Sequence, residues 1–449
     1  MRNFCSLLTL VFATLLVGCA EQNPVLDIEG GQVIGVPTAT EGVISYKGIP
    51  YAAAPVGELR WKAPQPVEAW EGVLTAKEYG PAGWQTDKTP GEFYQKEFFW
   101  EGDPERSEDC LYLNIWTPAA GRNKKLPVAM WIHGGAYTQG FGHEVEFDGE
   151  AWADKGVVLV TINYRLGIFG FYSHPVLSAE SPDGVSGNYG ILDQLAALTW
   201  VKNNIAAFGG DPDNITIFGQ SAGAGSVQTL LASPLAQPLI SKAIIQSGGG
   251  LNAPNQQGTS LADAEVMGAD FAAHYDMDIA AMREVQPREL MQMLATYPAA
   301  SGNRMSTRPI LDNHLSYDTF SNVARADELP DIPYMIGYVT KDGERQNSAI
   351  ADFALLREEQ GHRPVFTYKF VRELPGDEAG AFHSSELWYE FGTLARSWRP
   401  FEEADYDLSK QMITYWTNFV KTGDPNSSSV PEWMPYIKNN RQFKVLDIE

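Results

Sequence analysis

Short apolar runs rich in Val, Ile and Leu alternate with longer amphipathic stretches along most of this chain. Continuous apolar runs of this kind are typical of strands in a sheet that is covered on both faces. We expect such strands at PVAMWI (127–132), GVVLVTI (156–162), NITIFG (214–219), KAIIQSG (242–248), PYMIGY (333–338) and VFTYKF (365–370). The alternation predicts an α/β fold with a mostly parallel sheet, whose ligands bind at the carboxyl ends of the strands.

Two stretches between these runs have helical spacing. GILDQLAALTWVKNNIAAFG stops at Gly209-Gly210, and its apolar positions share one face: Ile191, Leu195, Leu198 and Ile205. LSKQMITYWTNFVKTGDP, near residues 408–425, also ends in Gly and Pro. The N-terminal third differs, because its many Pro and Gly residues separate shorter apolar runs. There we expect a short antiparallel edge and surface loops.

The composition narrows the class of protein. Hydrophobic residues make up 44% of the 449 residues, which is enough to bury a large core. The 33 Lys and Arg face 56 Asp and Glu, a formal net charge of −23, and this argues against a nucleic-acid partner. No linker, repeat or charge block divides the chain, so the simplest interpretation is one domain over residues 31–449.

The first residues predict export. MRNFCSLLTLVFATLLVGCA has one early charge, Arg2, and an apolar run that is too short for a membrane span. Its end, LVGC, resembles the lipobox of bacterial lipoproteins, which would leave Cys19 carrying lipid. We expect a signal peptide at 1–18 and an anchor and linker at 19–30, on the outer membrane, in the periplasm or at the cell surface. An ordinary signal peptide cut near Ala20 is the alternative.

Cysteine and histidine usage offers little support for a metal. Removal of the signal peptide and lipidation of Cys19 would leave Cys110 as the only free thiol, which excludes an intramolecular disulfide. The chain has no H-E-x-x-H, no C-x-x-C and no Cys/His cluster. We therefore expect neither a metal nor another cofactor.

The stretch FGQSAGAGS places Ser221 between the strand-like ITIFG and the helix-forming AGAGSVQTLLAS. A strand, a sharp turn and a helix, with small Gly219 and Gly223 around the serine, form the nucleophile elbow of α/β-hydrolases. A glycine-rich turn with an idle serine is the alternative interpretation of this motif taken alone.

A second glycine motif, WIHGGAY, follows the strand expected to end at Ile132. Gly134 and Gly135 lack a Cβ, so their backbone N–H groups can approach a substrate carbonyl. Together with the N–H of Ala222 they would form a three-donor oxyanion hole.

These motifs belong to a longer resemblance. YKGIPYAAAPVGELRWKAP, SEDCLYLNIWTP, WIHGGAY, NYRLGIFGF, GNYGILDQ, FGGDPDNITIFGQSAGAGS, QSGGG, GAFHSSEL and YWTNFVKTGDPN follow one another as the blocks of a known family do. The chain resembles the type B carboxylesterases, the α/β-hydrolase group that includes the cholinesterases and bacterial para-nitrobenzyl esterases. The blocks run from about residue 31 to the C-terminus.

The resemblance implies a Ser, Asp/Glu, His triad in that order. Block matching places the histidine at His383 of GAFHSSEL and the acid at Asp342 of YVTKDGERQ, with Glu344 as the alternative acid. Ser247 of QSGGG matches a family serine that supports the acid from behind. Glu386 matches a structural residue of the histidine block.

The chain departs from the family in three places. The segment between Asp342 and His383 is short, which implies a more open site. Gly83 stands where the disulfide partner of Cys110 would be, so the loop between them lacks its covalent tie. Gln220 replaces a glutamate, which weakens the case for a cationic substrate. The loop also carries aromatic residues that would form either a rim for apolar acyl or aryl groups or ordinary loop packing: Phe93, Tyr94, Phe98, Phe99 and Trp100.

Together these features predict a serine esterase that hydrolyses small carboxylic esters through an acyl-enzyme, without a cofactor. A non-catalytic binding or adhesion protein on the same fold is the alternative from another class. Cleavage of amides or carbamates by the same residues is a second enzymatic alternative.

Overall fold

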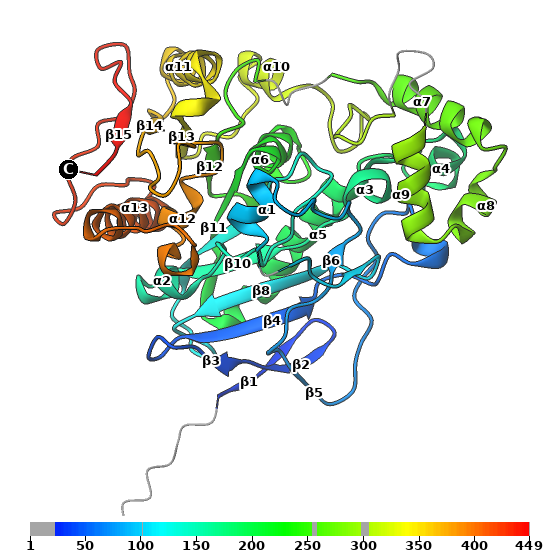
Figure 1. Cartoon of the computed structure of the whole chain (residues 1–449), viewed down its shortest axis with the longest axis horizontal. Helices are drawn as coiled ribbons and strands as arrows, with labels where there is room; N and C mark the ends of the chain where they lie inside the picture. Colours follow the sequence, from blue (N-terminus) through cyan, green and yellow to red (C-terminus); the bar gives the residue numbers. More distant parts are fainter. Residues whose placement is uncertain (1–22, 101, 254–257, 298–304, 449) are drawn as a thin grey trace, which may run out of the picture.

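The structure, a computed structural model, describes residues 23–100, 102–253, 258–297 and 305–448. A ten-stranded sheet crosses this part of the chain (Figure 1). In spatial order its strands are β15 (Lys444–Leu446), β14 (Phe366–Phe370), β13 (Tyr334–Val339), β12 (Lys242–Gln246), β11 (Gly210–Gln220), β9 (Leu126–Ile132), β10 (Val158–Ile162), β8 (Tyr112–Thr117), β4 (Ile44–Pro50) and β3 (Val36–Pro37).

As predicted, the sheet has a parallel part and an antiparallel edge. From β15 to β10 every neighbouring pair is parallel, whereas β10–β8, β8–β4 and β4–β3 are antiparallel. All six expected strands form, and the antiparallel edge comes from the N-terminal third. The predicted α/β fold with a mostly parallel sheet is confirmed.

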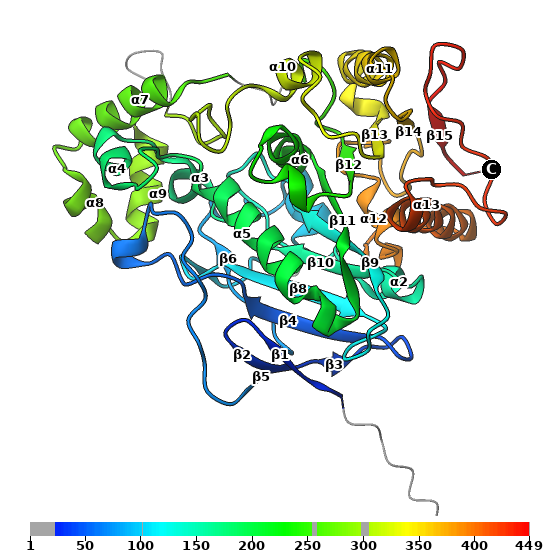
Figure 2. The ribbon, with the colours of Figure 1, turned by 180° about the vertical axis from the view of Figure 1, so that it is seen from behind.

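Alternate residues of the central strands contact different helical layers. On β9, Met130 and Ile132 belong to the core under α5 (Tyr189–Asn204) and α6 (Ala222–Ala232). Ala129 and Trp131 belong to a second core under α13 (Glu403–Thr422). Because successive side chains of a strand point to opposite faces, a strand covered on both sides reads as a continuous apolar run. In the view from behind (Figure 2), α5 and α6 lie in front of the sheet.

The two predicted helices form, with one difference. The first is α5, which ends at Asn204 and continues as a single 3-10 turn (Ile205–Phe208) to Gly209, whose φ is +81°. Its expected apolar face is buried except for Leu195, which is half-buried against the same core. The second is α13, which begins earlier than expected and stops at Gly423, φ +83°. Glycine relieves the strain of this left-handed ending.

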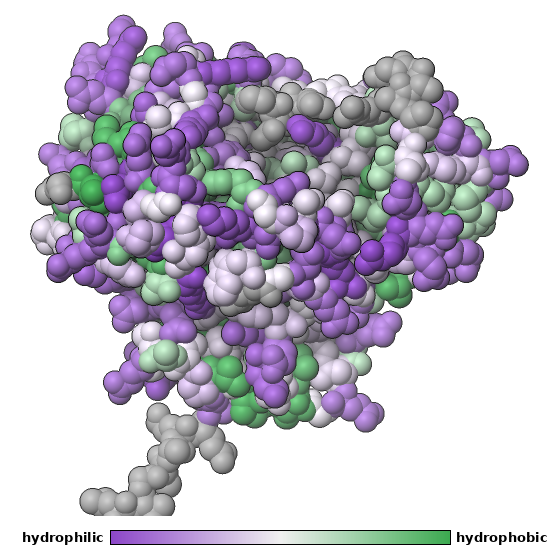
Figure 3. Space-filling view, viewed as in Figure 1, coloured by the Kyte–Doolittle hydropathy of each residue, from purple (hydrophilic) through white to green (hydrophobic). Residues whose placement is uncertain are grey.

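Shorter helices lie around the sheet (Figure 1). A group at one end of the molecule shares a small apolar core: α3 (Gly167–Phe171), α4 (Pro175–Glu180), α7 (Leu261–His274), α8 (Ile279–Glu284) and α9 (Pro287–Thr296). The others are α1 (Phe93–Phe98), α2 (Glu150–Asp154), α10 (Phe320–Arg325), α11 (Glu344–Glu359) and α12 (Leu387–Glu390). Figure 3 shows that hydrophilic residues dominate the face seen in Figure 1.

The folded chain begins before residue 31, where we expected it to begin. Val25–Ile28 forms β1, which pairs with β2 (Gly31–Ile34), and β5 (Val73–Thr75) completes a small sheet. A two-residue turn at Glu29-Gly30 joins β1 and β2, so the expected linker is partly a strand. Two further short strands, β6 (Ala82–Gly83) and β7 (Arg106–Ser107), pair with each other. The predicted signal peptide and Cys19 lie outside the described residues, and no described helix has the length and apolarity to span a membrane.

Candidate active site

Ser221 stands at the sharp turn between β11 and α6. Its φ of +57° and ψ of −118° are strained for a residue with a side chain, at a cost on the order of 1–3 kcal/mol. The turn also needs glycine on both sides. A Cβ at Gly223 would lie 2.0 Å from the carbonyl oxygen of Ile132, and one at Gly219 would lie 2.6 Å from the same atom. The local sequence thus holds the serine in the geometry of a nucleophile elbow.

The loops after β13 and β14 bring an acid and a histidine together. Asp342 ends a 3-10 turn (Thr340–Asp342), and its Oδ1 lies 2.7 Å from Nδ1 of His383. The backbone N–H of Lys341 donates to the carbonyl of Ala381, 3.2 Å away, and joins the two loops. Glu344 is exposed at the start of α11. Of the two expected acids, the structure therefore places Asp342 against His383.

The surroundings of His383 favour the tautomer of a general base. Nε2 of His383 lies 3.3 Å from Nε2 of Gln220, an amide nitrogen that can only donate. The imidazole Nε2 therefore accepts, and the ring proton is on Nδ1, facing Asp342. Burial alone would lower the pKa of His383, but the hydrogen bond and charge of Asp342 outweigh burial and raise this pKa above its ordinary value.

The glycine loop after β9 lies beside the serine. A Cβ at Gly134 would meet the Cβ of Ser221 at 3.3 Å. Gly135 has a φ of +95°, and a Cβ there would lie 2.0 Å from the carbonyl oxygen of Gln139, so only glycine fits. Ala222 is the first residue of α6, where a backbone N–H has no acceptor in the preceding turn. Gly134 and Ala222 thus adjoin Ser221, and Gly135 lines the same cavity.

Ser221, His383 and both glycines line one cavity of about 210 Å³. This volume is below the roughly 300–1,000 Å³ of sites for drug-sized ligands, so it suits a small acyl or alcohol group. Three of the five loop aromatics also line it: Tyr94, Phe98 and Phe99. The ring of Phe93 instead packs edge-on against Phe382, and Trp100 is 46% exposed. The loop therefore combines a pocket wall with ordinary packing.

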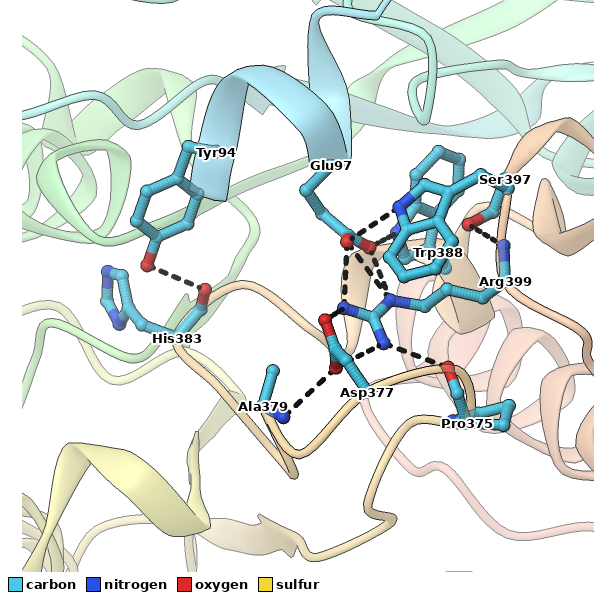
Figure 4. Close-up of polar contacts among 10 residues, drawn as sticks. Tyr94, Glu97, Pro375, Asp377, Ala379, His383, Trp388, Ser397 and Arg399 are labelled. Atoms are coloured by element: carbon cyan, nitrogen blue, oxygen red, sulfur yellow. Dashed lines mark hydrogen bonds and ion pairs between the residues drawn. The ribbon is translucent and has the colours of Figure 1, made fainter. Parts of the chain in front are cut away.

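Buried charged groups and hydrogen bonds connect α1, which carries Tyr94 and Phe98 of the pocket wall, to the loop that contains His383 (Figure 4). The carboxylate of Glu97, on α1, accepts hydrogen bonds from Trp388, Trp398 and Arg399, with Nε of Arg399 at 2.9 Å and 3.0 Å from its two oxygens. The hydroxyl of Tyr94 donates to the backbone carbonyl of His383, 3.2 Å away. The aromatic wall and His383 are thus parts of one connected unit.

Behind Asp342 and His383 lies a layer of buried carboxyls. The hydroxyl of Ser247, which we expected to support the acid from behind, donates to Oε1 of Glu386 at 3.1 Å. Burial, followed by the charge of Asp342, raises the pKa of Glu386 to about 7. Glu390, which sequence reasoning missed, is also fully buried and accepts from Gln246 at 2.6 Å.

Sequence reasoning also missed several polar residues that line the cavity, among them Lys88, Gln139, Glu144 and Glu146. None of these four belongs to a motif with a chemical meaning of its own. Lys88 stands in the irregular loop before α1, and both glutamates belong to the loop between β9 and α2. Their convergence depends on long-range packing, which local sequence patterns do not report.

Comparisons with known proteins identify the family of this chain. The model of the carboxylesterase family matches residues 22–354 and 346–449. The chain is 35% identical to the para-nitrobenzyl esterase of Bacillus subtilis (strain 168), over 93% of this chain and 94% of that protein. It is 39% identical to the fumonisin B1 esterase of Sphingopyxis macrogoltabida over 79% of this chain, but the match covers only 61% of that protein.

Solved structures show the same relationship. A thermophilic para-nitrobenzyl esterase superposes with a TM-score of 0.82 at 30% identity, covering 95% of this chain and 96% of that one. The resemblance seen in the sequence blocks is therefore confirmed over nearly the whole chain. The chain belongs to the carboxylesterase family of ester hydrolases and has the α/β-hydrolase fold.

Proposed function

We propose that this protein is a serine esterase that uses Ser221, His383 and Asp342 as its triad. The observation that carries the proposal is the Asp342–His383 hydrogen bond of 2.7 Å in loops that meet at the strained Ser221. Nε2 of His383 would remove the proton from Ser221 Oγ as that oxygen attacks the ester carbonyl. The charge of Asp342 would stabilise the imidazolium that forms.

The developing oxyanion would be held by the backbone N–H groups of Gly134, Gly135 and Ala222. His383 then returns its proton to the leaving alcohol, and an acyl group stays on Ser221. In the second half of the cycle, water gives a proton to His383 and attacks the acyl carbonyl. The bond between the acyl carbon and Ser221 Oγ then breaks, His383 returns its proton to Oγ, and the carboxylic acid leaves. No cofactor takes part.

The aromatic wall supports a substrate with an apolar portion. Tyr94, Phe98 and Phe99 form one side of the cavity, and Phe147 and Leu387 also line it. Such a surface stabilises hydrocarbon through removal of apolar area from water, at about 25 cal/mol per Å². A short alkyl or aryl group next to the scissile bond is the substrate part that this wall suits.

Hydrolysis of p-nitrophenyl butyrate by the purified protein tests the proposal. We expect turnover by the wild type, a loss of about 10⁴-fold or more in kcat for Ser221→Ala and for His383→Ala, and covalent labelling of Ser221 by an organophosphate. Absence of both turnover and labelling would favour the non-catalytic binding protein. Faster cleavage of matched anilides or carbamates would favour the amide or carbamate hydrolase.

We also propose that the chain is exported and anchored through a lipid on Cys19. The lipobox-like LVGC at residues 16–19 supports this proposal. Metabolic labelling with a palmitate analogue in a bacterial host should mark the wild type and leave Cys19→Ala unlabelled and in the soluble fraction. Equal fractionation of both proteins would contradict the anchor.

A further inference from the structure

The candidate active site contains a basic side chain that the triad does not use. Among the described residues that line the cavity, Lys88 is the only lysine or arginine. Its Nζ donates to Oε1 of Gln139 at 2.7 Å and lies 4.1 Å from the ring centroid of Phe99. The backbone N–H of Gln139 in turn donates to the carbonyl of Gly135, 3.0 Å away. The ammonium group of Lys88 is therefore held close to the glycine loop after β9, which contains Gly134 and Gly135.

This ammonium has no counterion in the described parts of the chain. No described carboxylate lies within ion-pair distance of Lys88 Nζ, whose recorded contacts are the neutral amide of Gln139 and the ring of Phe99. Burial lowers the pKa of Lys88, and this effect outweighs the more distant charges of Glu144, Asp103 and Glu92, which raise it. A partly buried charge of this kind is stabilised when an anion binds beside it.

The two acidic residues of the same cavity, Glu144 and Glu146, disfavour each other's negative charge. Burial raises the pKa of both Glu144 and Glu146, and the charge of Glu144 raises the pKa of Glu146 further. Oε1 of Glu144 accepts the N–H of Phe141 at 2.9 Å. Burial and mutual repulsion thus disfavour negative charge on this carboxyl pair, and neither glutamate forms an ion pair with Lys88 among the described residues.

We propose that Lys88 binds a free carboxylate on the substrate, so that the preferred esters are those of acids or alcohols that carry a second, unesterified carboxyl group. This inference rests on the esterase function proposed above. The aromatic wall would contact the short hydrocarbon between the scissile carbonyl and the carboxylate. Lys88 and Gln139 would then determine which esters bind with their carbonyl carbon next to Ser221.

Matched pairs of anionic and neutral esters test this specificity. Monoethyl glutarate carries its carboxylate on the acyl side, and its primary amide, ethyl glutaramate, is the neutral counterpart. The butyryl ester of 3-hydroxypropanoate and the butyryl ester of the corresponding amide place the same groups on the alcohol side. In pH-stat assays we expect kcat/KM of the wild type to be at least tenfold higher for the anionic member of one pair, and that pair identifies the side.

Lys88→Met removes the charge while retaining an apolar stem, and Lys88→Gln is a second variant in case the first folds poorly. Either change should reduce the anionic-to-neutral ratio of kcat/KM to about one. Lys96→Met is the matched control, because Lys96 belongs to the same loop but its Nζ lies 3.8 Å from the ring centroid of Trp398, outside the cavity lining. The control should keep the wild-type ratio.

A wild-type ratio near one, or a preference that survives in both Lys88 variants, would overturn the inference. A preference for esters with an ammonium group would also overturn it and would assign Glu144 and Glu146 as a cation site. Calorimetry separates this inference from the esterase proposal. Ser221→Ala should bind glutarate, and Ser221→Ala with Lys88→Met should not, whatever the hydrolytic activity. Failure of p-nitrophenyl butyrate hydrolysis contradicts the esterase function, whereas failure of glutarate binding contradicts only the role of Lys88.

Discussion

At the scale of single residues, the site depends on the coupling between His383 and its neighbours. Asp342 raises the pKa of the imidazole, while Gln220 donates to the opposite nitrogen. The same carboxylate also raises the pKa of Glu386, which is buried behind it. One charge therefore raises the pKa of the proposed catalytic base on one side and adds to the effect of burial on Glu386 on the other.

Replacement Asp342→Asn should lower kcat by about 10⁴-fold, because the neutral amide neither fixes the tautomer nor stabilises the imidazolium. It should also move the acidic limb of the pH–rate profile to lower pH, since the charge that raises the pKa of His383 is lost. Stopped assays with p-nitrophenyl butyrate from pH 5 to 9 measure both effects. Glu344→Gln is the control, and a comparable loss in that variant would instead identify Glu344 as the acid.

Glu386 makes stability depend on pH. Its pKa in the folded protein, about 7, is above the ordinary 4.5, so the fold favours the protonated carboxyl. Its contribution to the free energy of unfolding is complete below pH 4.5 and is lost as pH rises through 7. Glu386→Gln has no proton to lose and should be destabilised less between pH 5 and 8, by on the order of 3 kcal/mol. Urea unfolding at both pH values measures this, and identical pH dependence in the two proteins would contradict the assigned protonation.

At the scale of elements, α1 is held by charge rather than by a covalent bond. Glu97 and Arg399 are almost completely buried, and Nη1 of Arg399 also bonds Asp377 and the carbonyl of Pro375, both at 2.9 Å. Loss of one member of a buried ion pair leaves the other charge unpaired, which costs several kcal/mol. This buried ion pair therefore stabilises the position of α1 more than the short length of the helix would suggest.

Glu97→Ala should lower the free energy of unfolding by about 3–5 kcal/mol and raise KM for esters, because the aromatic wall and the His383 loop lose their common support. Denaturation curves and Michaelis kinetics test both parts. Glu92→Ala, at the exposed N-cap of the same helix, should change neither. An increase in KM of equal size in the control would show that the helix as a whole, and not its buried anchor, controls the pocket.

Features formed by residues close in sequence could be predicted, whereas contacts between distant segments could not. The elbow at Ser221 and the glycines after β9 are local motifs, and their geometry could be predicted because strand, turn and helix signals adjoin in sequence. Matching the family's blocks was needed to place His383. The partner of Ser247, the buried position of Glu390 and the approach of Lys88 to the cavity depend on segments far apart in sequence, so no periodicity predicts them.

At the scale of the whole molecule, the long loop that ends at Cys110 is where this chain differs most from the expected pattern. Cys110 is buried as a free thiol, and burial raises its pKa strongly, which makes it unreactive. A Cβ at Gly83 would lie 3.6 Å from Cys110 Sγ. The position that lacks a cysteine is thus already in place for a cross-link.

Gly83→Cys should form a disulfide with Cys110 after mild oxidation and raise the melting temperature, since closure of a loop of this length contributes up to about 3–4 kcal/mol. Thiol titration and melting with and without reductant measure the bond and its effect. The double variant Gly83→Cys with Cys110→Ala is the control and should respond to neither treatment. Two thiols that remain titratable in the single variant under non-reducing conditions would contradict the predicted geometry.

The ion pair between Glu97 and Arg399 has a consequence for where this enzyme can mature. Its pocket wall is assembled by charge neutralisation and tryptophan hydrogen bonds, and the cysteine described in the structure is unpaired. Assembly of the described site therefore needs no oxidant and no disulfide isomerase. Treatment with dithiothreitol should therefore leave this wall intact, and we expect the pocket to form under reducing as well as oxidising conditions.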